Sequence, residues 1–561
     1  MSWMNEVLRH SSRFNRTYVE QSIEQSIEIT FTKLINCLYD EVTSPIQWVE
    51  ESHDTKKLYL SDDTCIMYRQ AQPLVHLYEN NMKKTMMDPL ELIDWLALHS
   101  QGVYDYGQLK IEIENHLINQ ALSLIYCAHM PKSDHPLLHG EQYVVQGHNI
   151  HPCAKTKLGL TFDEVMQYSP EYNQAFKLNW VLVKEGLLYN NLEAEELNIL
   201  AQFSGYKGEI PVGYHLIPVH PYQFKHVISR VYAEEIASKR IILLSHRGGL
   251  VKSTSSFRTV CPIDGVTPMM KLPVNSQMTS TIRSISNNSI INSKYIGEYF
   301  KYIYQHDERL QEISLPVLEF GGMTYCHPLE EKQRNLSFIL RENNAQYLAA
   351  DASLFAATCL FEYNELGIKV YQDLISSAES IATPMEWFKQ YASILIETAV
   401  TLMSKYGIGL EAHLQNMSFE FKHGMPSRLH VRDFGGLRID TTRIPRWVEL
   451  TQALTNATTE QMYEKVQNTL ISNHLETLVA HFSEDYGCEE SDLWQWINQT
   501  FQTVFNQLRL QNLPHVQPDM NAFYTETINE KALLTMRISP ASGDIYVQKS
   551  NPLVTYDHVQ V

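Results

Sequence analysis

The sequence predicts an α+β protein built from several domains, and three changes of pattern along the chain predict this class. Apolar residues recur at helical spacing in residues 1–135, whereas 136–345 is made of short apolar runs separated by Gly, Pro, Ser and Asn. Residues 346–561 return to helical spacing and add one hairpin pattern. With 561 residues, two or three large domains are expected.

The first segment, 1–135, is expected to be mainly helical. Leu92, Ile93, Trp95 and Leu96 lie close to helical spacing, and a similar pattern continues over 117–125. Few residues here suggest chemistry, so we interpret this segment as a packing or dimer-contact domain.

The second segment, 136–345, is expected to be rich in β-strands. Short apolar runs occur at 143–145, 214–219, 241–244 and 268–273, with turn residues between them. Helical insertions are expected near 162–203.

The third segment, 346–561, opens with a well-marked helix. Thr383 is a suitable N-cap, Pro384 occupies the first helical position and Glu386 completes a capping box. Apolar residues then follow at helical spacing until Gly407, which predicts the end of the helix.

Charge and composition exclude several classes of protein. Lys and Arg number 45 against 64 Asp and Glu, a net charge of −19, which disfavours a nucleic-acid or anionic-membrane binder. No apolar run is long enough to span a membrane, and no signal-peptide pattern opens the chain. The eight cysteines are spread singly, without a CxxC pair. We expect a cytoplasmic protein with reduced thiols.

The strongest local motif is a predicted hairpin between His413 and Gly436. Two alternating runs flank the turn 423–426, and pairing 418 with 431 and 420 with 429 brings Asn416 beside Asp433. An amide oxygen next to a carboxylate suits Mg²⁺ with nucleotide phosphates, and protein kinases use a similar layout. The alternative is a structural hairpin with a capping aspartate.

A second motif interleaves hydroxyl and cationic side chains between residues 239 and 283. Seven basic residues face the single acid Asp264 in this stretch, a local excess of six positive charges. Ser256, Arg258, Thr259 and Lys271 lie on what are predicted to be neighbouring strands. Arg forks, Lys ammonium groups and hydroxyls bind phosphate and carboxylate oxygens, so we favour an anion pocket over a solvated basic face.

Two histidine-containing segments complete the set. In 147–159, Lys155 and Lys157 indicate an anion site. The alternative is a metal site formed by His148, His151 and Cys153, but no fourth ligand is nearby in the sequence. In 215–223, His220 precedes Pro221 and by itself is compatible with a buried core histidine.

Taken in this order, the four segments resemble the IucA/IucC family, the siderophore synthetases that work without a nonribosomal peptide synthetase. The resemblance runs from about residue 140 to the C-terminus, and 531–537 with 551–553 also fit it. It implies a hand-like architecture with a helical thumb (1–135), β-rich fingers (136–345) and a kinase-like palm (346–561). ATP would bind between fingers and palm.

The resemblance also implies a reaction, cofactors and partners. A carboxylate, commonly citrate, attacks the α-phosphate of ATP, and an amine or alcohol then displaces AMP from the acyl adenylate. ATP and Mg²⁺ are the implied cofactors, a homodimer is the implied assembly, and neither nucleic acid nor membrane is an expected partner.

The resemblance also implies roles for the residues of this sequence that match the family's motifs. The implied catalytic residues are Arg283, His413 and Lys271. The implied ATP-binding residues are Ser256, Arg258, Thr259, Lys271, Gln415, Asn416 and Asp433. The implied carboxylate-binding residues are His148, Lys155, His220, Arg283 and His413, and the implied metal ligands are Asn416, Asp433 and Glu411. Tyr222 and Lys157 stand where the family often has Trp and Arg, which leaves the shape of the carboxylate pocket open.

Three other functions are alternatives to the ligase. A small-molecule kinase should have a catalytic-base Asp shortly before its metal-binding Asn, and residues 411–416 contain none. A ferric-siderophore reductase should have a terminal cysteine cluster, but no cysteine follows Cys488 in this sequence. A protein that only binds citrate or an iron chelate is the remaining alternative.

Overall fold

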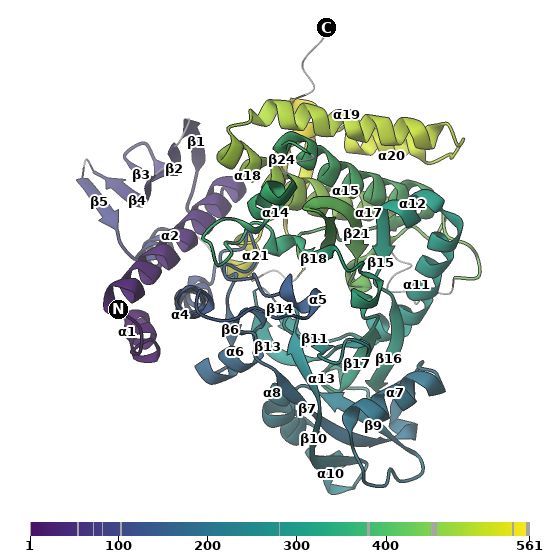
Figure 1. Ribbon diagram of the computed structural model, residues 1–561. Helices are drawn as coiled ribbons and strands as arrows, with labels where there is room; N and C mark the ends of the chain where they lie inside the picture. Colours follow the sequence, from purple (N-terminus) through teal and green to yellow (C-terminus); the bar gives the residue numbers. More distant parts are fainter. Residues whose placement is uncertain are drawn as a thin grey trace.

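The computed structural model describes residues 2–556 apart from 53–54, 71, 81, 101–103, 280, 379–381, 449, 451–456 and 541–542. Helices and strands are mixed throughout, so the predicted α+β class is confirmed. Three main hydrophobic cores lie in the N-terminal, middle and C-terminal parts of the chain, which pack closely against one another (Figure 1).

The N-terminal part combines helices with an antiparallel sheet. Its helices are α1 (Ser2–His10), α2 (Arg16–Glu41), α3 (Pro89–His99), α4 (Tyr106–Cys127) and α5 (Pro136–His139). Its five strands pair in chain order: β1 (Trp48–Ser52), β2 (Thr55–Ser61), β3 (Thr64–Arg69), β4 (Gln72–Glu79) and β5 (Met82–Met86). The expectation of a mainly helical segment is therefore incomplete, because it overlooked this sheet.

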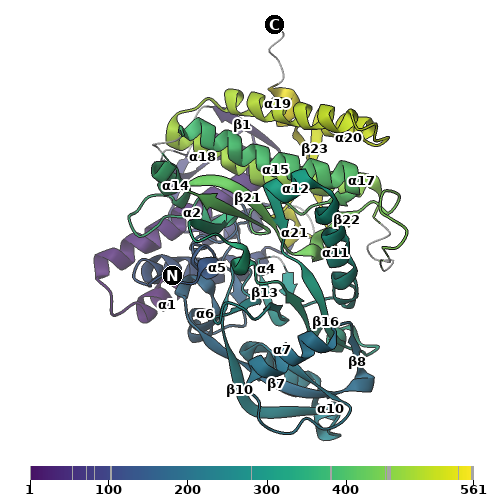
Figure 2. The ribbon, with the colours of Figure 1, turned by 45° about the vertical axis from the view of Figure 1, so that its right-hand side comes forward.

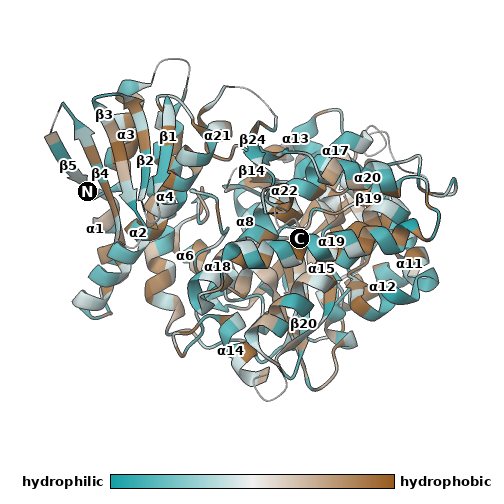
Figure 3. Cartoon of the chain, turned by 90° about the horizontal axis from the view of Figure 1, so that it is seen from above, coloured by the Kyte–Doolittle hydropathy of each residue, from teal (hydrophilic) through white to brown (hydrophobic). Residues whose placement is uncertain are grey.

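The sheet β1–β5 has an alternating pattern that charged residues disguise. Leu58, Ile66 and Leu77 face one another across β2, β3 and β4 and are buried, whereas many of the residues between them are polar or charged. Period-two burial of this kind is typical of a sheet that packs on one face. That face lies against α2, at one end of the molecule (Figure 3).

The middle part is built on an eight-stranded sheet, in the order β8-β16-β17-β12-β11-β10-β7-β9. These strands are β7 (Phe176–Lys184), β8 (Leu188–Asn190), β9 (Tyr214–Val219), β10 (Ile241–Ser253), β11 (Thr259–Pro262), β12 (Met269–Lys271), β16 (Glu319–Tyr325) and β17 (Ser337–Arg341). A small sheet joins β6 (Lys157–Leu158), β13 (Val274–Met278) and β14 (Thr281–Arg283). The helices around them are α6 (Phe162–Tyr168), α7 (Ala194–Ser204), α8 (Pro221–Gln223), α9 (Ser229–Val231), α10 (Ala233–Ala237), α11 (Asn287–His306), α12 (Glu308–Ile313) and α13 (Glu330–Asn335).

The C-terminal part packs helices on a four-stranded sheet, in the order β15-β21-β20-β18 (Figure 2). The strands are β15 (Ser314–Pro316), β18 (Ala352–Ala356), β20 (Met417–Lys422) and β21 (Met425–Val431), with the short pairs β19 (Ile408–Gly409)–β22 (Arg438–Ile439) and β23 (Thr527–Lys531)–β24 (Tyr546–Ser550). The helices are α14 (Val370–Ala378), α15 (Pro384–Tyr406), α17 (Thr459–Val466), the π-helix η7 (Gln467–Leu475), α18 (Glu476–Tyr486), α19 (Glu490–Arg509), α20 (Val516–Phe523), α21 (Thr535–Ile538) and α22 (Pro552–Thr555).

Helix α15 has the predicted ends. Thr383 and Glu386 form a capping box, Pro384 opens the helix, and Gly407 ends it with φ of 67°. The helix is buried along most of its length against the sheet, so it forms the centre of the largest core.

The hairpin β20–β21 is present, but its register differs from the prediction by one residue. His423 and Gly424 form a two-residue turn with φ of 50° and 79°, tighter than the four-residue turn expected, and an irregularity after residue 420 follows. Residue 418 therefore pairs with 430, not 431, and 420 pairs with 428, not 429. Asn416 consequently lies opposite Arg432, and the Arg432 backbone N–H donates to the Asn416 carbonyl at 3.2 Å. Asp433 is one residue further along the chain.

None of the described helices is both long and apolar enough to cross a membrane.

Candidate active site

Several of the predicted site residues converge on a cavity between the middle and C-terminal parts of the chain. Its walls come from the loop 144–157, the turn 255–257, strand β14, the loop 413–415 and helix η7. Six of the predicted residues line it directly: His148, Lys155, Ser256, Arg283, His413 and Gln415.

The loop 144–157 brings two lysines to one buried carboxylate. Lys155 donates to Glu171 at 2.5 Å and to the Val144 carbonyl at 2.8 Å, and Lys157 reaches the same carboxylate at 3.2 Å. Burial by itself would raise the pKa of Glu171, but the two lysines lower it to about 2. The cavity wall therefore carries one more positive charge than negative here.

Gly147 starts this loop in a conformation that needs glycine. Its φ is 72°, and a Cβ there would lie 2.9 Å from the Ala154 carbonyl oxygen. The turn holds His148 over the cavity, where burial lowers the pKa of its imidazole to about 3. His148 is thus a neutral hydrogen-bonding group at pH 7. Among the described residues no cluster of three His, Cys, Asp or Glu side chains is arranged to hold a metal, which removes the support for a zinc site.

Arg283 supplies the cavity's guanidinium group. It ends β14 and donates to Thr279 Oγ1 at 2.8 Å. In the loop 413–415, His413 Nδ1 accepts from the Gln415 backbone N–H at 3.2 Å, and burial lowers the pKa of this imidazole. Arg283 therefore provides a charge and His413 a neutral hydrogen-bonding group.

The turn 254–259 has the predicted neighbours. The Thr259 backbone N–H donates to Ser256 Oγ at 3.2 Å, and Thr259 lies opposite Lys271 in the ladder of β11 and β12. Gln415 joins the turn from the C-terminal part by donating to the Ser255 carbonyl at 2.8 Å. The Thr259 hydroxyl is buried without a hydrogen-bond partner in the described structure, so its bonding capacity is unused.

Lys271 and Arg258 belong to a buried cationic cluster around Asp433. Lys271 Nζ lies 2.5 Å from Asp433 Oδ1, and Arg341 lies 3.6 Å from Oδ2 while also binding Glu319 at 2.8 Å. Burial would raise the pKa of Asp433, but Lys271, Arg341 and Arg258 hold it well below its ordinary value. Asp433 is the counter-charge of a cluster that otherwise suits phosphate.

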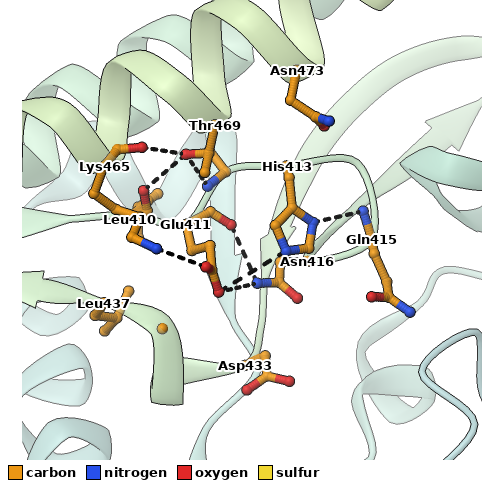
Figure 4. A network of polar contacts seen from close by, with 12 residues as sticks. Leu410, Glu411, His413, Gln415, Asn416, Asp433, Leu437, Lys465, Thr469 and Asn473 are labelled. Carbon is orange, nitrogen blue, oxygen red and sulfur yellow. Dashed lines mark hydrogen bonds and ion pairs between the residues drawn. The ribbon is translucent and has the colours of Figure 1, made fainter. Parts of the chain in front are cut away.

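Glu411 and Asn416 form a neighbouring group (Figure 4). Glu411 Oε1 accepts from Lys465 at 2.8 Å, and Asn416 Nδ2 donates to Glu411 Oε2 at 3.3 Å. His413 Nε2 lies 3.9 Å from Glu411 Oε2. Burial would raise the pKa of Glu411, but Lys465 and His413 lower it to about 2, while the charge of Asp433 acts in the opposite sense.

The predicted contact of Asn416 with Asp433 is thus replaced. Asn416 bonds Glu411, and Asp433 bonds Lys271, because the tighter hairpin turn moves Asp433 beyond Asn416. The three oxygen-bearing side chains still share one region, since Asp433 and Glu411 influence each other's charge.

His220 is not part of the cavity wall. It caps α8, where its Nδ1 accepts from the Tyr222 backbone N–H at 3.2 Å, and it packs among Tyr168, Phe176 and Phe257. Phe257 stands between it and the cavity. Burial lowers the pKa of His220 to about 3, and its Nε2 is buried without a hydrogen-bond partner in the described structure, so carboxylate binding by His220 stays a prediction.

Several residues of the site carry no sequence motif. Glu141 forms a buried ion pair with Arg432, and Glu141 Oε2 also accepts from the Ser255 backbone N–H at 2.9 Å. Asn473 lies in the π-helix η7 and accepts from the Leu414 backbone N–H at 3.3 Å. A further residue of the site, Arg341, has a weak signal in the sequence, because it is a charged residue at the end of the apolar run 337–341.

Comparison with known proteins agrees with the resemblance. Residues 136–361 match the IucA / IucC family, and residues 385–544 match the family described as ferric iron reductase FhuF-like transporter. Staphyloferrin A synthase of Staphylococcus aureus is 28% identical over 74% of this chain and 73% of its own length. D-ornithine--citrate ligase of the same organism is 26% identical over 75% of this chain and 70% of its own length.

Solved structures share the fold. Petrobactin biosynthesis protein AsbB from Bacillus anthracis superposes with a TM-score of 0.79 at 18% identity, over 97% of this chain and 98% of its own. ATP-bound aerobactin synthetase IucA from Klebsiella pneumoniae gives a TM-score of 0.78 at 16% identity, over 94% of this chain and 99% of its own.

Proposed function

We propose that the chain, whose residues 136–361 match the IucA/IucC family, is a siderophore synthetase that works as an ATP-dependent, AMP-forming ligase. It adenylates citrate or a citryl derivative and condenses the acyl group with an amine or alcohol. Relatives named for ligation to citrate support the choice of acid. The observation that carries the proposal is a cavity where three cations face one carboxylate, beside a second cationic cluster.

In this proposal the three parts of the chain act as thumb, fingers and palm. ATP lies between the β-rich fingers (136–345) and the palm (346–561). The ATP-bound relative supports ATP as a substrate. A cytoplasmic homodimer is part of the same proposal, and light scattering of the purified protein measures its assembly.

The turn 254–259 and strand β12 would bind the phosphates of ATP. Arg258 and Lys271 supply charge, and Ser256 and Thr259 supply hydroxyls, of which the Thr259 hydroxyl has an unused bonding capacity. Lys271 would exchange Asp433 for a phosphate oxygen when ATP binds.

Arg283 and His413 would act on the reacting groups. A carboxylate oxygen of the acid attacks the α-phosphorus, the bond to the pyrophosphate oxygen breaks, and pyrophosphate leaves with the electron pair. Arg283 pairs with the carboxylate and neutralises charge that develops at phosphorus, an effect that is large in a buried site. His413, neutral at pH 7, donates a hydrogen bond to the same oxygens, and His148 and Lys155 hold the remaining carboxylates.

The oxygen donors Glu411, Asn416 and Asp433 fit Mg²⁺, which prefers hard oxygen ligands and keeps part of its coordination for phosphates. The charge of Asp433 acts to raise the pKa of Glu411, so the two carboxylates lie in one region of the site. Bound there, Mg²⁺ would neutralise phosphate charge.

The test is a turnover assay with citrate, ATP and hydroxylamine, which traps acyl adenylates as hydroxamates. The proposal predicts equal amounts of AMP, pyrophosphate and hydroxamate. A panel of other di- and tricarboxylates is run in parallel. Release of ADP would indicate a kinase, and no nucleotide turnover with any acid would indicate a protein that only binds its ligand.

A further inference from the structure

Two segments that carry predicted ATP-binding residues touch each other although they are far apart in the chain. The turn 254–259 belongs to the middle part, and the loop 413–416, which includes the Gln415 and Asn416 labelled in Figure 4, belongs to the C-terminal part. Gln415 Nε2 donates to the Ser255 carbonyl at 2.8 Å. A nucleotide that uses both segments depends on the distance between them.

The guanidinium group of Arg432 binds both segments at once. Its Nε and Nη2 donate to the Gln415 carbonyl at 3.1 and 2.7 Å, and Nη2 also donates to Ser255 Oγ at 3.0 Å. The Arg432 backbone N–H donates to the Asn416 carbonyl at 3.2 Å. The side chain of Arg432 is 9% exposed, so water competes little for these hydrogen bonds.

Glu141 supplies the counter-charge of Arg432 from a third segment. Both of its carboxylate oxygens accept from the guanidinium group, and Oε2 also accepts from the Ser255 backbone N–H at 2.9 Å. Burial by itself would raise the pKa of Glu141, but Arg432 lowers it below its ordinary value, so the pair is charged at pH 7. Ser255 is therefore bound by both members of the ion pair.

The backbone next to Glu141 is fixed against the four-stranded sheet. The preceding residue, Gly140, pairs with Phe355 of β18. A Cβ at Gly140 would overlap the Leu354 carbonyl oxygen, so this close approach requires glycine. Strand β21 belongs to the same sheet, and its last residue directly precedes Arg432. Both members of the ion pair are thus anchored on one rigid element.

We propose that Arg432 and Glu141 are positioning residues of the ligase, whose ion pair holds the turn 254–259 and the loop 413–416 at the separation that ATP binding requires. This inference rests on the proposed function. The pair acts through Ser255 and Gln415, which it contacts directly, and not through a contact with the nucleotide. A site whose two halves are already in place binds its ligand without the entropic cost of ordering them.

The first test replaces Arg432 with Lys. Lysine keeps a positive charge for Glu141 but lacks the planar fork that reaches Gln415 and Ser255 together. We expect Arg432→Lys to raise the Kd of Mg·ATP, measured by calorimetry, about tenfold, the usual effect of losing hydrogen bonds to a charged group. An unchanged Kd would show that charge balance alone is needed, and would overturn the inference.

Hydrogen exchange of the nucleotide-free protein tests the ion pair without ATP. The amides of Ser255 and Arg432 donate to Glu141 and to Asn416, and we expect Arg432→Lys to speed their exchange about tenfold. The matched control is Arg443→Lys, the same change in a buried pair with Asp519 outside the site. It should lower stability but change neither the exchange of these two amides nor the Kd.

A second variant covers the case in which Arg432→Lys does not fold. Glu141→Gln keeps an oxygen for the Ser255 N–H and removes the counter-charge of Arg432. We expect it to raise the Kd of Mg·ATP about threefold, because the remaining hydrogen bonds are between neutral and charged groups. An unchanged Kd in this variant would also overturn the inference.

The outcomes separate the two proposals. Wild-type protein that binds no ATP would refute the ligase, and the positioning role with it. Wild-type binding combined with faster exchange but an unchanged Kd in Arg432→Lys would overturn the positioning role alone. A merely structural ion pair would behave like the Arg443→Lys control, with lower stability and both measurements unchanged, which contradicts the inference as well.

Discussion

Replacing Asp433 with Asn tests both the cationic cluster and the metal proposal. The change keeps the shape of the side chain but leaves Lys271, at 2.5 Å, and Arg341, at 3.6 Å, without their shared counter-charge. Breaking a buried ion pair typically costs 3–5 kcal/mol, and the Asp433 side chain is 21% exposed, so we expect the lower end, about 3 kcal/mol of unfolding free energy. ATP phosphates would restore the missing charge.

Nucleotide binding should then depend on the metal. We expect the Kd of Mg·ATP to rise about tenfold or more, because a carboxylate ligand is lost. The Kd of metal-free ATP, measured by calorimetry with EDTA present, should stay constant or fall, because Lys271 is released for phosphate. The matched control is Asp519→Asn, which removes a buried partner of Arg443 outside the site and should destabilise without changing either Kd. An unchanged Kd for Mg·ATP in Asp433→Asn would refute the metal role.

Three further changes test the carboxylate cavity. Arg283→Ala should lower pyrophosphate release with citrate about 100-fold while the circular dichroism spectrum stays the same, and near-normal turnover would remove Arg283 from the site. Glu171→Gln leaves Lys155 and Lys157 buried without a counter-charge and should lower the unfolding free energy by about 3 kcal/mol in urea titration; an unchanged midpoint would contradict this. Because the pKa of Glu171 is lowered to about 2, its contribution to stability is present above its ordinary pKa of 4.5 and is lost as pH falls towards 2. The stability difference between wild type and Glu171→Gln should therefore shrink over that interval, and a constant difference would argue against the low pKa.

Local signals in the sequence were sufficient where the physical cause is also local. The capping box at Thr383 and the terminator Gly407 define α15 as predicted, because both act through neighbouring backbone groups. The proximity of Thr259 and Lys271 was also predicted, since alternating hydroxyl and cationic residues on successive strands face each other in an antiparallel ladder.

Long-range placement was harder to predict. The hairpin register depended on whether the turn used two residues or four, and His423 with a positive φ gives no sequence signal as clear as Asn-Gly would. The sheet β1–β5 was missed because charged residues interrupt its apolar alternation. His220 fits the family motif, yet its side chain packs behind Phe257, a fact that depends on contacts between distant segments.

Arg341 illustrates the same limit. It ends an apolar run, next to Glu342, and its significance arises only from the carboxylates that the fold brings beside it, Asp433 and Glu319. The family resemblance supplied the reaction, and the structure supplied the partners of each charge.

The most direct test of adenylation follows a carboxylate oxygen. Citrate labelled with ¹⁸O in its carboxylates is incubated with ATP and an accepted amine, and the nucleotide products are examined by mass spectrometry. Attack on the α-phosphorus transfers one citrate oxygen to AMP, so AMP should carry a single ¹⁸O and pyrophosphate none. Unlabelled AMP, or ADP together with labelled inorganic phosphate, would contradict the proposed acyl adenylate.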